Sequence, residues 1–326
     1  MIETPTALVL GAGASFAYGL PLNDGLRSSL YNIGSESALD NSALVAAGFS
    51  RDEILTFSEE FKLSQAPSID EFLSHRAADY SRVGKASIAA IIRAHERPGE
   101  LLIPTTDPKD HWHMYLWAQL TEDATFETLD RNELTVVTFN YDRSLETYLS
   151  YAMGARFRKT PEECAESLLK GWLSIIHVYG EVAGNYGWNG TSIDSILPSL
   201  TDSALDKLHV IPEGDNRDTR VMQVRGVLSS AKRICFLGFS FQKLNLDRLD
   251  SKVTCTNNSP QGNFREVWGT AYGLKNKEIY QAESRCGLHV GREWPRPREP
   301  MNWAGFYNMK CLDLLRESLV LSSPET

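Results

Sequence analysis

The sequence lacks several features that would assign it to well-known protein classes. Its five cysteines, at positions 164, 235, 255, 286 and 311, are odd in number and form no C-x-x-C pair. We therefore expect neither a disulfide framework nor a four-cysteine zinc site. No run of about 18 apolar residues occurs, which predicts no transmembrane helix and no membrane partner. The first residues, M-I-E-T-P, hold an acid and no basic segment, so we expect no secretory signal and a cytoplasmic location.

An excess of positive charge is also missing. The 326 residues include 33 Lys and Arg against 42 Asp and Glu, which gives a formal net charge of -9. Because sequence-independent binding to nucleic acid needs a basic face, we expect no strong direct nucleic-acid binding, although a local basic patch stays open. The 42% hydrophobic and 23% charged content is typical of a folded protein, and the length allows one large domain or two ordinary ones.

What the chain does contain is an alternation of short apolar runs with helical patterns. Residues 6–15 read T-A-L-V-L-G-A-G-A-S, the pattern of a strand, a tight turn and the start of a helix. Later apolar runs also end at glycine or polar residues. This alternation predicts an α/β fold: a Rossmann-like, mostly parallel sheet flanked by helices. Further strands are predicted from Thr135, at Leu173–Val178, at Arg233–Ser240 and at Asn263–Ala271.

Between the first two predicted strands, residues 24–132 read as mainly helical. We expect a large helical insertion there, within a single domain over 1–326 that has a C-terminal extension at 286–326. Ser68 and Glu71 have the spacing of a capping box that opens a helix through about Tyr80. Other helices are predicted at Asn23–Tyr31 with Asn23 as its cap, at His111–Leu120, Ser144–Met153, Thr219–Ala231 and Lys275–Ser284, and near Trp303–Leu319.

The stretch Thr135–Asp142, T-V-V-T-F-N-Y-D, is the most informative part of the chain. β-Branched residues run directly into Asn140 and Asp142, so a buried strand delivers two polar side chains at its C-terminal end. Ligands of open parallel sheets bind just beyond these ends. A site is one interpretation; the other is that Asn140 begins a turn and Asp142 caps the next helix.

Two glycine turns follow predicted strands in a similar manner. Gly11, Gly13 and Ser15 precede a predicted helix, where backbone N–H groups favour a diphosphate. The full G-x-G-x-x-G fingerprint is not met because position 16 is Phe, and no acidic residue lies about 20 positions further on. An ordinary dehydrogenase is therefore disfavoured, and a turn needed only for packing stays open. Gly238 and Ser240 end another strand and, with Asn245, suit phosphate or ribose contacts or turn chemistry.

His177 lies at the end of the predicted strand Leu173–Val178. A neutral imidazole there can accept a proton from water or a hydroxyl group. The alternative is a core histidine whose ring nitrogens are satisfied by neighbours. The other histidines show no metal-ligand spacing, so no metal site is expected.

Taken in order, four strand ends carry G-A-G-A-S, F-N-Y-D, H-V-Y-G and G-F-S-F. This order resembles the sirtuin-like superfamily, and most of all the bacterial sirtuin-like NAD hydrolases of antiphage defence. Gly19-Leu20-Pro21, Ser68–Leu73 (S-I-D-E-F-L) and F-L-G-F-S-F at 236–241 also resemble stretches of that group. The resemblance covers about residues 6–285.

The resemblance implies a role for each strand end. Asn140 would hold the nicotinamide ribose and the attacking water, Asp142 would lie near the nicotinamide amide, and His177 would be the general base or orient the ribose hydroxyls. NAD would be a substrate rather than a recycled cofactor. The residues implied in binding it are Gly11, Ala12, Gly13 and Ser15 at the diphosphate, Gly238, Ser240 and Asn245 at the adenosine side, and Phe139.

Two departures from the protein deacylases of the superfamily bear on the reaction. Their two C-x-x-C pairs are missing, which predicts no structural zinc, and His177 is followed by V-Y-G where deacylases have Gly directly. We therefore expect NAD⁺ hydrolysis to nicotinamide and ADP-ribose. The alternatives are an NAD-dependent deacylase or ADP-ribosyltransferase, and a non-catalytic nucleotide-binding assembly subunit. The resemblance also implies a homo-oligomer, with an ATPase of the HerA type or an Argonaute-like protein as a partner.

Overall fold

In the computed structural model of the protein, the described residues are 1–35, 39–97, 101–105, 109–182, 196–209, 219–255, 265–288 and 305–322. Among them, the strands form one six-stranded sheet in the order β3-β2-β1-β4-β5-β6. Every neighbouring pair is parallel. The α/β, Rossmann-like fold expected from the sequence is confirmed. The strands are β1 (Thr6–Leu10), β2 (Leu134–Thr138), β3 (Ser174–His177), β4 (Arg233–Leu237), β5 (Glu266–Thr270) and β6 (Gly305–Tyr307).

The central strand β1 fixes where a ligand site can form. All five of its residues are buried, as expected for a strand covered on both faces. Its last residue, Leu10, pairs with Thr138 of β2 on one side and with Leu237 of β4 on the other. The strand order therefore reverses around β1, and the ends of β1, β2 and β4 meet at one edge. This edge is the topological switch point of the sheet, where open α/β folds bind ligands.

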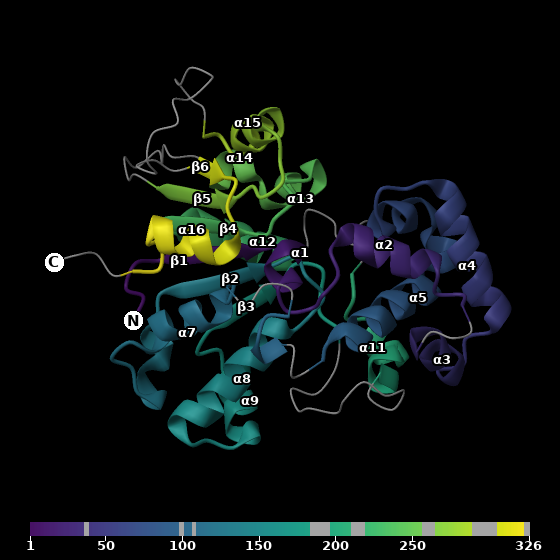
Figure 1. Ribbon diagram of the computed structural model, residues 1–326, viewed down its shortest axis with the longest axis horizontal. Coiled ribbons are helices and arrows are strands. Elements are labelled where there is room, and N and C mark those ends of the chain that lie inside the picture. The colour runs from purple at the N-terminus through teal and green to yellow at the C-terminus, as the bar shows by residue number, and fades with distance from the viewer. Residues whose placement is uncertain are drawn as a thin grey trace.

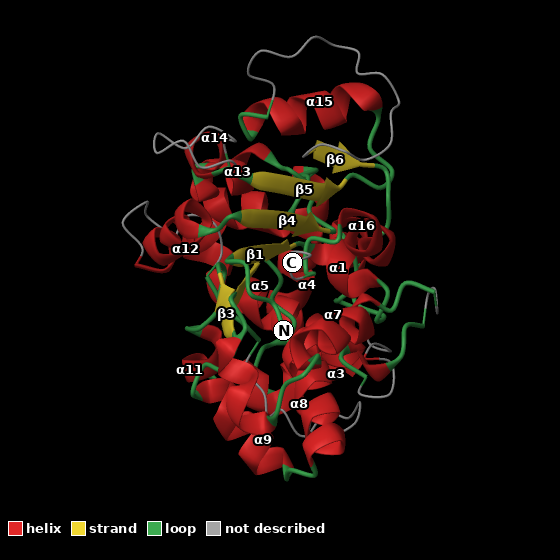
Figure 2. Ribbon diagram, turned by 90° about the vertical axis from the view of Figure 1, so that its left-hand side faces the viewer, coloured by secondary structure: helices red, strands yellow, loops and turns green. Residues whose placement is uncertain are grey.

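Helices cover both faces of the sheet. In Figure 2, β4 and β5 run across the view, with α12 and α13 to their left and α16 to their right. The helices are α1 (Ala12–Phe16), α2 (Asn23–Tyr31), α3 (Leu39–Ala46), α4 (Arg51–Ser64), α5 (Ile69–His95), α7 (Trp112–Thr121), α8 (Ser144–Phe157), α9 (Pro161–Leu169), α11 (Asp202–Leu205), α12 (Thr219–Ser230), α13 (Lys243–Leu249), α14 (Ser251–Thr254), α15 (Asn276–Arg285) and α16 (Cys311–Ser318), with 3₁₀ helices η1 (Phe126–Arg131) and η2 (Leu197–Leu200).

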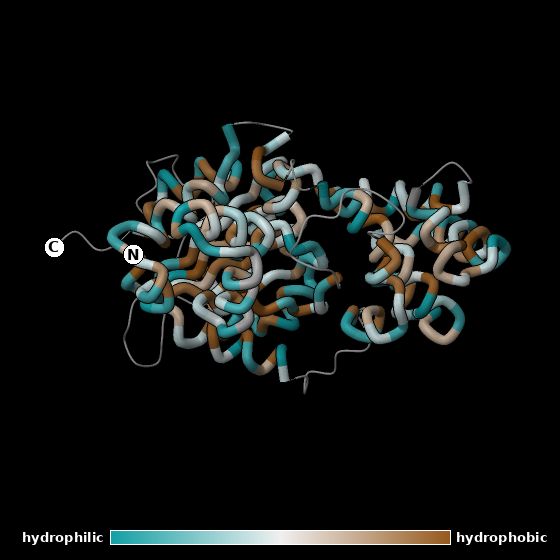
Figure 3. The backbone as a smooth tube through the Cα atoms, turned by 90° about the horizontal axis from the view of Figure 1, so that it is seen from below, coloured by the Kyte–Doolittle hydropathy of each residue, from teal (hydrophilic) through white to brown (hydrophobic). Residues whose placement is uncertain are grey.

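Helices α2 to α5 form a lobe beyond the C-terminal edge of the sheet. Figure 1 shows this lobe, with α11 against it, on the far side of α1 from the strands, and Figure 3 shows the same separation from below. Phe57 and Phe61 of α4 pack on Phe72 and Tyr80 of α5 inside the lobe. In contrast, α7 lies beside the sheet and packs on α8 and α16. The helical stretch predicted at 24–132 therefore contributes helices both to the lobe and to the layer beside the sheet.

The long helix α5 begins directly after Ser68, as predicted, but it continues past the predicted end near Tyr80 to His95. The Ser68 side chain accepts a hydrogen bond from the Glu71 N–H, at 3.2 Å. Near the same end, Asp70 accepts a hydrogen bond of 2.9 Å from the Tyr141 hydroxyl. Tyr141 follows Asn140 directly, so the start of α5 ties the helical lobe to the loop after β2.

Two sequence predictions about local structure were wrong. Residues 305–307 form β6, although a helix was predicted from about Trp303, because Gly305 and Phe306 pair with β5 and the helix begins only at Cys311. Asn23 is the first residue of α2 rather than its cap, because its side chain donates to the Pro67 carbonyl instead of turning back onto the helix.

Within the described part of the chain, none of the helices combines the length and the apolar character that a membrane span requires.

Candidate functional site

Asn140 lies at the centre of a hydrogen-bond network that joins three strand ends. Its side-chain Nδ2 donates to the Gly11 carbonyl and to the Ser15 Oγ, both at 3.0 Å. Its own backbone carbonyl accepts from Nδ1 of His177, at 3.0 Å. Because Asn140 is only 8% exposed, these contacts hold its amide in one orientation. The ends of β1, β2 and β3, distant in the sequence, are thereby connected.

Asp142 shapes the start of α8. Its Oδ1 accepts hydrogen bonds of 3.1 Å from the Ser144 N–H and from the Ser15 hydroxyl. Burial raises the pKa of Asp142, and the hydrogen bonds from Ser144 and Ser15 partly offset this rise. Arg143 rather than Asp142 is the N-cap of α8, although the Asp142 carboxylate accepts from the first N–H of the helix. A contact of Asp142 with nicotinamide stays a prediction.

The two glycine turns contact each other at the switch point. The N–H of Gly13 donates to the Gly238 carbonyl at 3.0 Å, and the Gly11 N–H donates to the Leu237 carbonyl at 3.0 Å. A Cβ placed on Gly11 or Gly13 would lie within 2.6–2.9 Å of backbone atoms of the β4 turn. Packing alone therefore requires these glycines. The Gly13 and Ala14 N–H groups already donate to backbone carbonyls, so a diphosphate at α1 would have few free donors in this arrangement.

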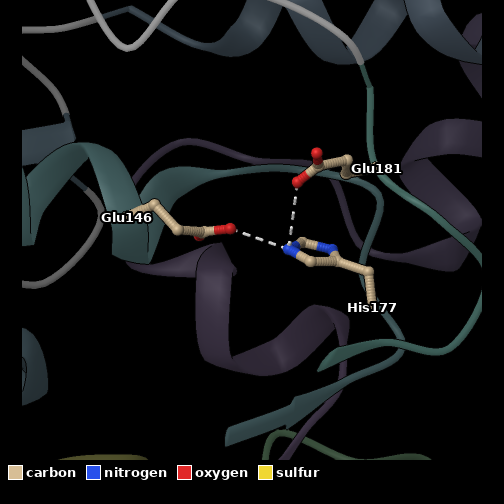
Figure 4. A group of neighbouring side chains, drawn as sticks. All are labelled: Glu146, His177 and Glu181. Atoms are coloured by element: carbon tan, nitrogen blue, oxygen red, sulfur yellow. Dashed lines mark hydrogen bonds and ion pairs between the residues drawn. The ribbon is translucent and has the colours of Figure 1, made fainter. Parts of the chain in front are cut away.

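The imidazole of His177 has partners on both sides. Its Nε2 lies 2.7 Å from Oε1 of Glu146 and 3.7 Å from Oε2 of Glu181, as Figure 4 shows. Burial alone would lower the pKa of His177, but the two carboxylates and the Asn140 carbonyl outweigh burial and raise it. Likewise, burial would raise the pKa of Glu146, but His177 lowers it. His177 and Glu146 thus form a buried ion pair when the imidazole is protonated.

Glu146 and Glu181 are site residues that sequence analysis missed. Glu146 lies in the first turn of α8, where its side chain points inward and is 8% exposed. An acidic residue on the buried side of a predicted helix could have been noticed, but its partner could not. Glu181 lies in the loop after β3 and is 34% exposed, so nothing in its local sequence distinguishes it from a surface residue.

The other predicted binding residues lie along the same edge but outside this network. Asn245 of α13 accepts a hydrogen bond from the Tyr179 hydroxyl, and Arg248 lies over the Tyr179 ring at 4.7 Å. Phe139 packs against Phe239, with ring centroids 5.0 Å apart. Ser240 is exposed and Ala12 is half-buried at the start of α1. Contacts of these residues with NAD stay predictions.

A pocket of about 530 Å³ opens beside β3. Its walls include His177 and Glu181 together with Lys207, His209 and Arg220. Its volume lies in the range of small-molecule sites. A second, much smaller cavity of about 10 Å³ lies between Asn140, Asp142 and His113, which is room for about one water molecule. The network around Asn140 thus has a large pocket on the His177 side.

A scan against protein-family models found no model that matches this chain, and a search of curated proteins found no match. The functional argument therefore rests on the geometry of the site and on the order of the strand-end motifs.

Proposed function

We propose that the protein hydrolyses the bond between nicotinamide and ribose in NAD⁺ and releases nicotinamide and ADP-ribose. The observation that carries the proposal is the network around Asn140, which links the ends of β1, β2 and β3 at the switch point of a parallel sheet. The order of the strand-end motifs, similar to that of the sirtuin-like NAD hydrolases, supports the same reaction.

This reaction needs little acid catalysis, because nicotinamide leaves as a neutral molecule and does not have to be protonated. Positive charge builds on the ribose instead, as in glycoside hydrolysis. A fixed amide that orients water or a ribose hydroxyl suits this reaction, and the Asn140 side chain has that character. Glu146 and Glu181 add negative charge near the same edge, which would favour a cationic transition state.

His177 takes a positioning role in this proposal. Its Nδ1 faces the Asn140 carbonyl and its Nε2 faces Glu146, so neither ring nitrogen is open to an attacking water. The hydrogen bond to the carbonyl holds the backbone of Asn140 in place. A role as general base would require Nε2 to leave Glu146 first.

The test is nicotinamide release from NAD⁺ by the purified protein, followed by chromatography. Asn140→Ala is expected to reduce release by at least about 100-fold, as the loss of a positioned polar group in an active site does. Asn41→Ala is the matched control, because Asn41 is also buried and its Nδ2 also donates to a backbone carbonyl, that of Ile33. Full activity of Asn140→Ala, or release by neither the wild type alone nor the wild type purified with its cellular partners, would contradict the proposal.

We extend the proposal to antiphage defence, in which NAD depletion would halt an infected cell. The support is the family resemblance, which also suggests a homo-oligomer activated by assembly with a partner such as a HerA-type ATPase. Constitutive loss of NAD would harm the host, so the isolated chain is expected to be quiet until it assembles. Co-purification from the host, with mass determination and an NAD assay on the intact assembly, tests this extension.

A further inference from the structure

Three potential metal ligands converge beside β3. These are Nε2 of His177, a carboxylate oxygen of Glu146 and a carboxylate oxygen of Glu181, and all three atoms lie within 4.8 Å of one another. They come from two parts of the chain: Glu146 from the first turn of α8, and His177 and Glu181, four residues apart, from the end of β3 and the loop after it. Figure 4 shows that both carboxylates point toward the same imidazole nitrogen.

The protonation of the imidazole is constrained by its other nitrogen. Nδ1 faces the Asn140 carbonyl, which only accepts hydrogen bonds, so Nδ1 carries the hydrogen. In the neutral ring Nε2 would then present a lone pair to the Glu146 oxygen only 2.7 Å away. Two lone pairs at that distance repel, so a proton or a cation must lie between them. A ring whose second nitrogen donates to a backbone carbonyl is also the usual arrangement of a metal-ligating histidine.

The second carboxylate favours a metal ion over a proton. A proton on Nε2 can form a hydrogen bond with Glu146 only, because the Glu181 oxygen, 3.7 Å from Nε2, is too distant for one. Metal bonds of about 2.0–2.2 Å at tetrahedral angles separate neighbouring ligand atoms by roughly 3.3 Å. The two observed separations from Nε2, 2.7 and 3.7 Å, lie on either side of this value. Small side-chain movements would therefore complete the coordination.

The setting also leaves room for a further ligand. His177 and Glu181 line the pocket of about 530 Å³, so an ion bound to them would face that pocket. Three protein ligands with one open position are typical of catalytic rather than structural metal sites. Arg143 competes for the site, because its Nε lies 3.5 Å from the same Glu181 oxygen. Ion binding must therefore replace this ion pair.

We propose that Glu146, His177 and Glu181 bind a divalent transition-metal ion such as Mn²⁺ or Zn²⁺. One imidazole with two carboxylates suits these ions better than Mg²⁺ or Ca²⁺, which prefer oxygen ligands alone. The site goes beyond the proposed NAD hydrolysis and departs from the sequence-based expectation of no metal. An ion on Nε2 leaves the contact between Nδ1 and Asn140 intact, but it offsets the negative charge of Glu146 and Glu181, so the proposed hydrolysis with the ion bound relies on the Asn140 amide.

The test is Mn²⁺ binding to the full-length protein after treatment with EDTA and dialysis, without NAD. Loss of the free-ion signal in electron paramagnetic resonance gives affinity and stoichiometry, and pulsed spectra detect a coordinated imidazole nitrogen. We expect one ion per chain and a nitrogen signal that His177→Gln abolishes. Glu181→Gln, at a position that is 34% exposed, is expected to weaken binding by about 100-fold or more.

Glu283→Gln is the matched control. Glu283 is a buried glutamate on α15, where it accepts a hydrogen bond from the Phe306 N–H, and its substitution should leave Mn²⁺ affinity unchanged. Failure of the wild type to bind Mn²⁺ or Zn²⁺ stoichiometrically, or equal affinity of Glu181→Gln and the wild type, would overturn the metal site. Because no NAD is present, either result leaves the proposed hydrolysis to its own assay.

Discussion

Replacing Gly238 by Ala tests whether the contact between the two glycine turns holds the switch point together. Gly238 has a φ of +59°, and an added Cβ would lie 2.0 Å from the Ala14 nitrogen and 2.2 Å from the Gly13 carbonyl carbon. These are backbone atoms, so no side-chain rotation can relieve the clash. The substitution must push the β1 turn away from the β4 turn.

The expected loss of folding free energy in Gly238→Ala has two contributions. A left-handed backbone conformation costs a non-glycine residue about 1–2 kcal/mol, and forcing extra atoms into a packed site costs typically about 1–3 kcal/mol more. Gly273→Ala separates them, because Gly273 has a φ of +82° but no atom within 4 Å of an added Cβ. We therefore expect about 1–2 kcal/mol of destabilisation for Gly273→Ala and about 2–5 kcal/mol for Gly238→Ala.

Urea unfolding monitored by tryptophan fluorescence measures the stability of both variants. Calorimetry measures their affinity for NAD and so reports the effect on the site. Gly238→Ala should also weaken NAD binding, because the displaced turn leads into α1, which holds Ser15, a hydrogen-bond partner of Asn140. Gly273→Ala should bind NAD as the wild type does. Equal losses of stability in the two variants would refute the argument that backbone contact, rather than backbone conformation, makes glycine necessary at position 238.

Two further predictions concern buried polar groups. Burial raises the pKa of Asp70, and Tyr141 and Arg248 only partly offset this, so its contribution to stability is present at low pH and is lost as pH rises through the folded-state pKa. Asp70→Asn should therefore raise Tm at pH 8, with a gain that shrinks toward pH 4; a gain that grows on acidification would contradict this. Trp112→Phe removes the Nε1 donor that bonds the Ala14 carbonyl at 2.7 Å, and should cost about 1–3 kcal/mol in urea unfolding; a change below about 0.5 kcal/mol would show that this carbonyl finds another donor.

The sequence by itself was sufficient for the α/β class, for most helices and strands, and for the polar strand ends. Buried parallel strands read as short apolar runs, and turn glycines mark where they stop, so both signals are local. The capping of α5 by Ser68 is local as well, since donor and acceptor are three residues apart. β6 was missed because three residues carry too little pattern, and pairing with β5 alone makes them a strand.

Which strand ends meet, and what surrounds them, was decided only by the tertiary structure. Glu146 and His177 are 31 residues apart in the chain, and they face each other because α8 begins directly after β2 and β3 pairs beside it. Similarly, Gly11 and Gly13 meet Gly238 only because β1 and β4 are neighbours in the sheet. Sequence periodicity describes one element at a time, whereas such contacts depend on strand order and register, which are set by the packing of the whole core.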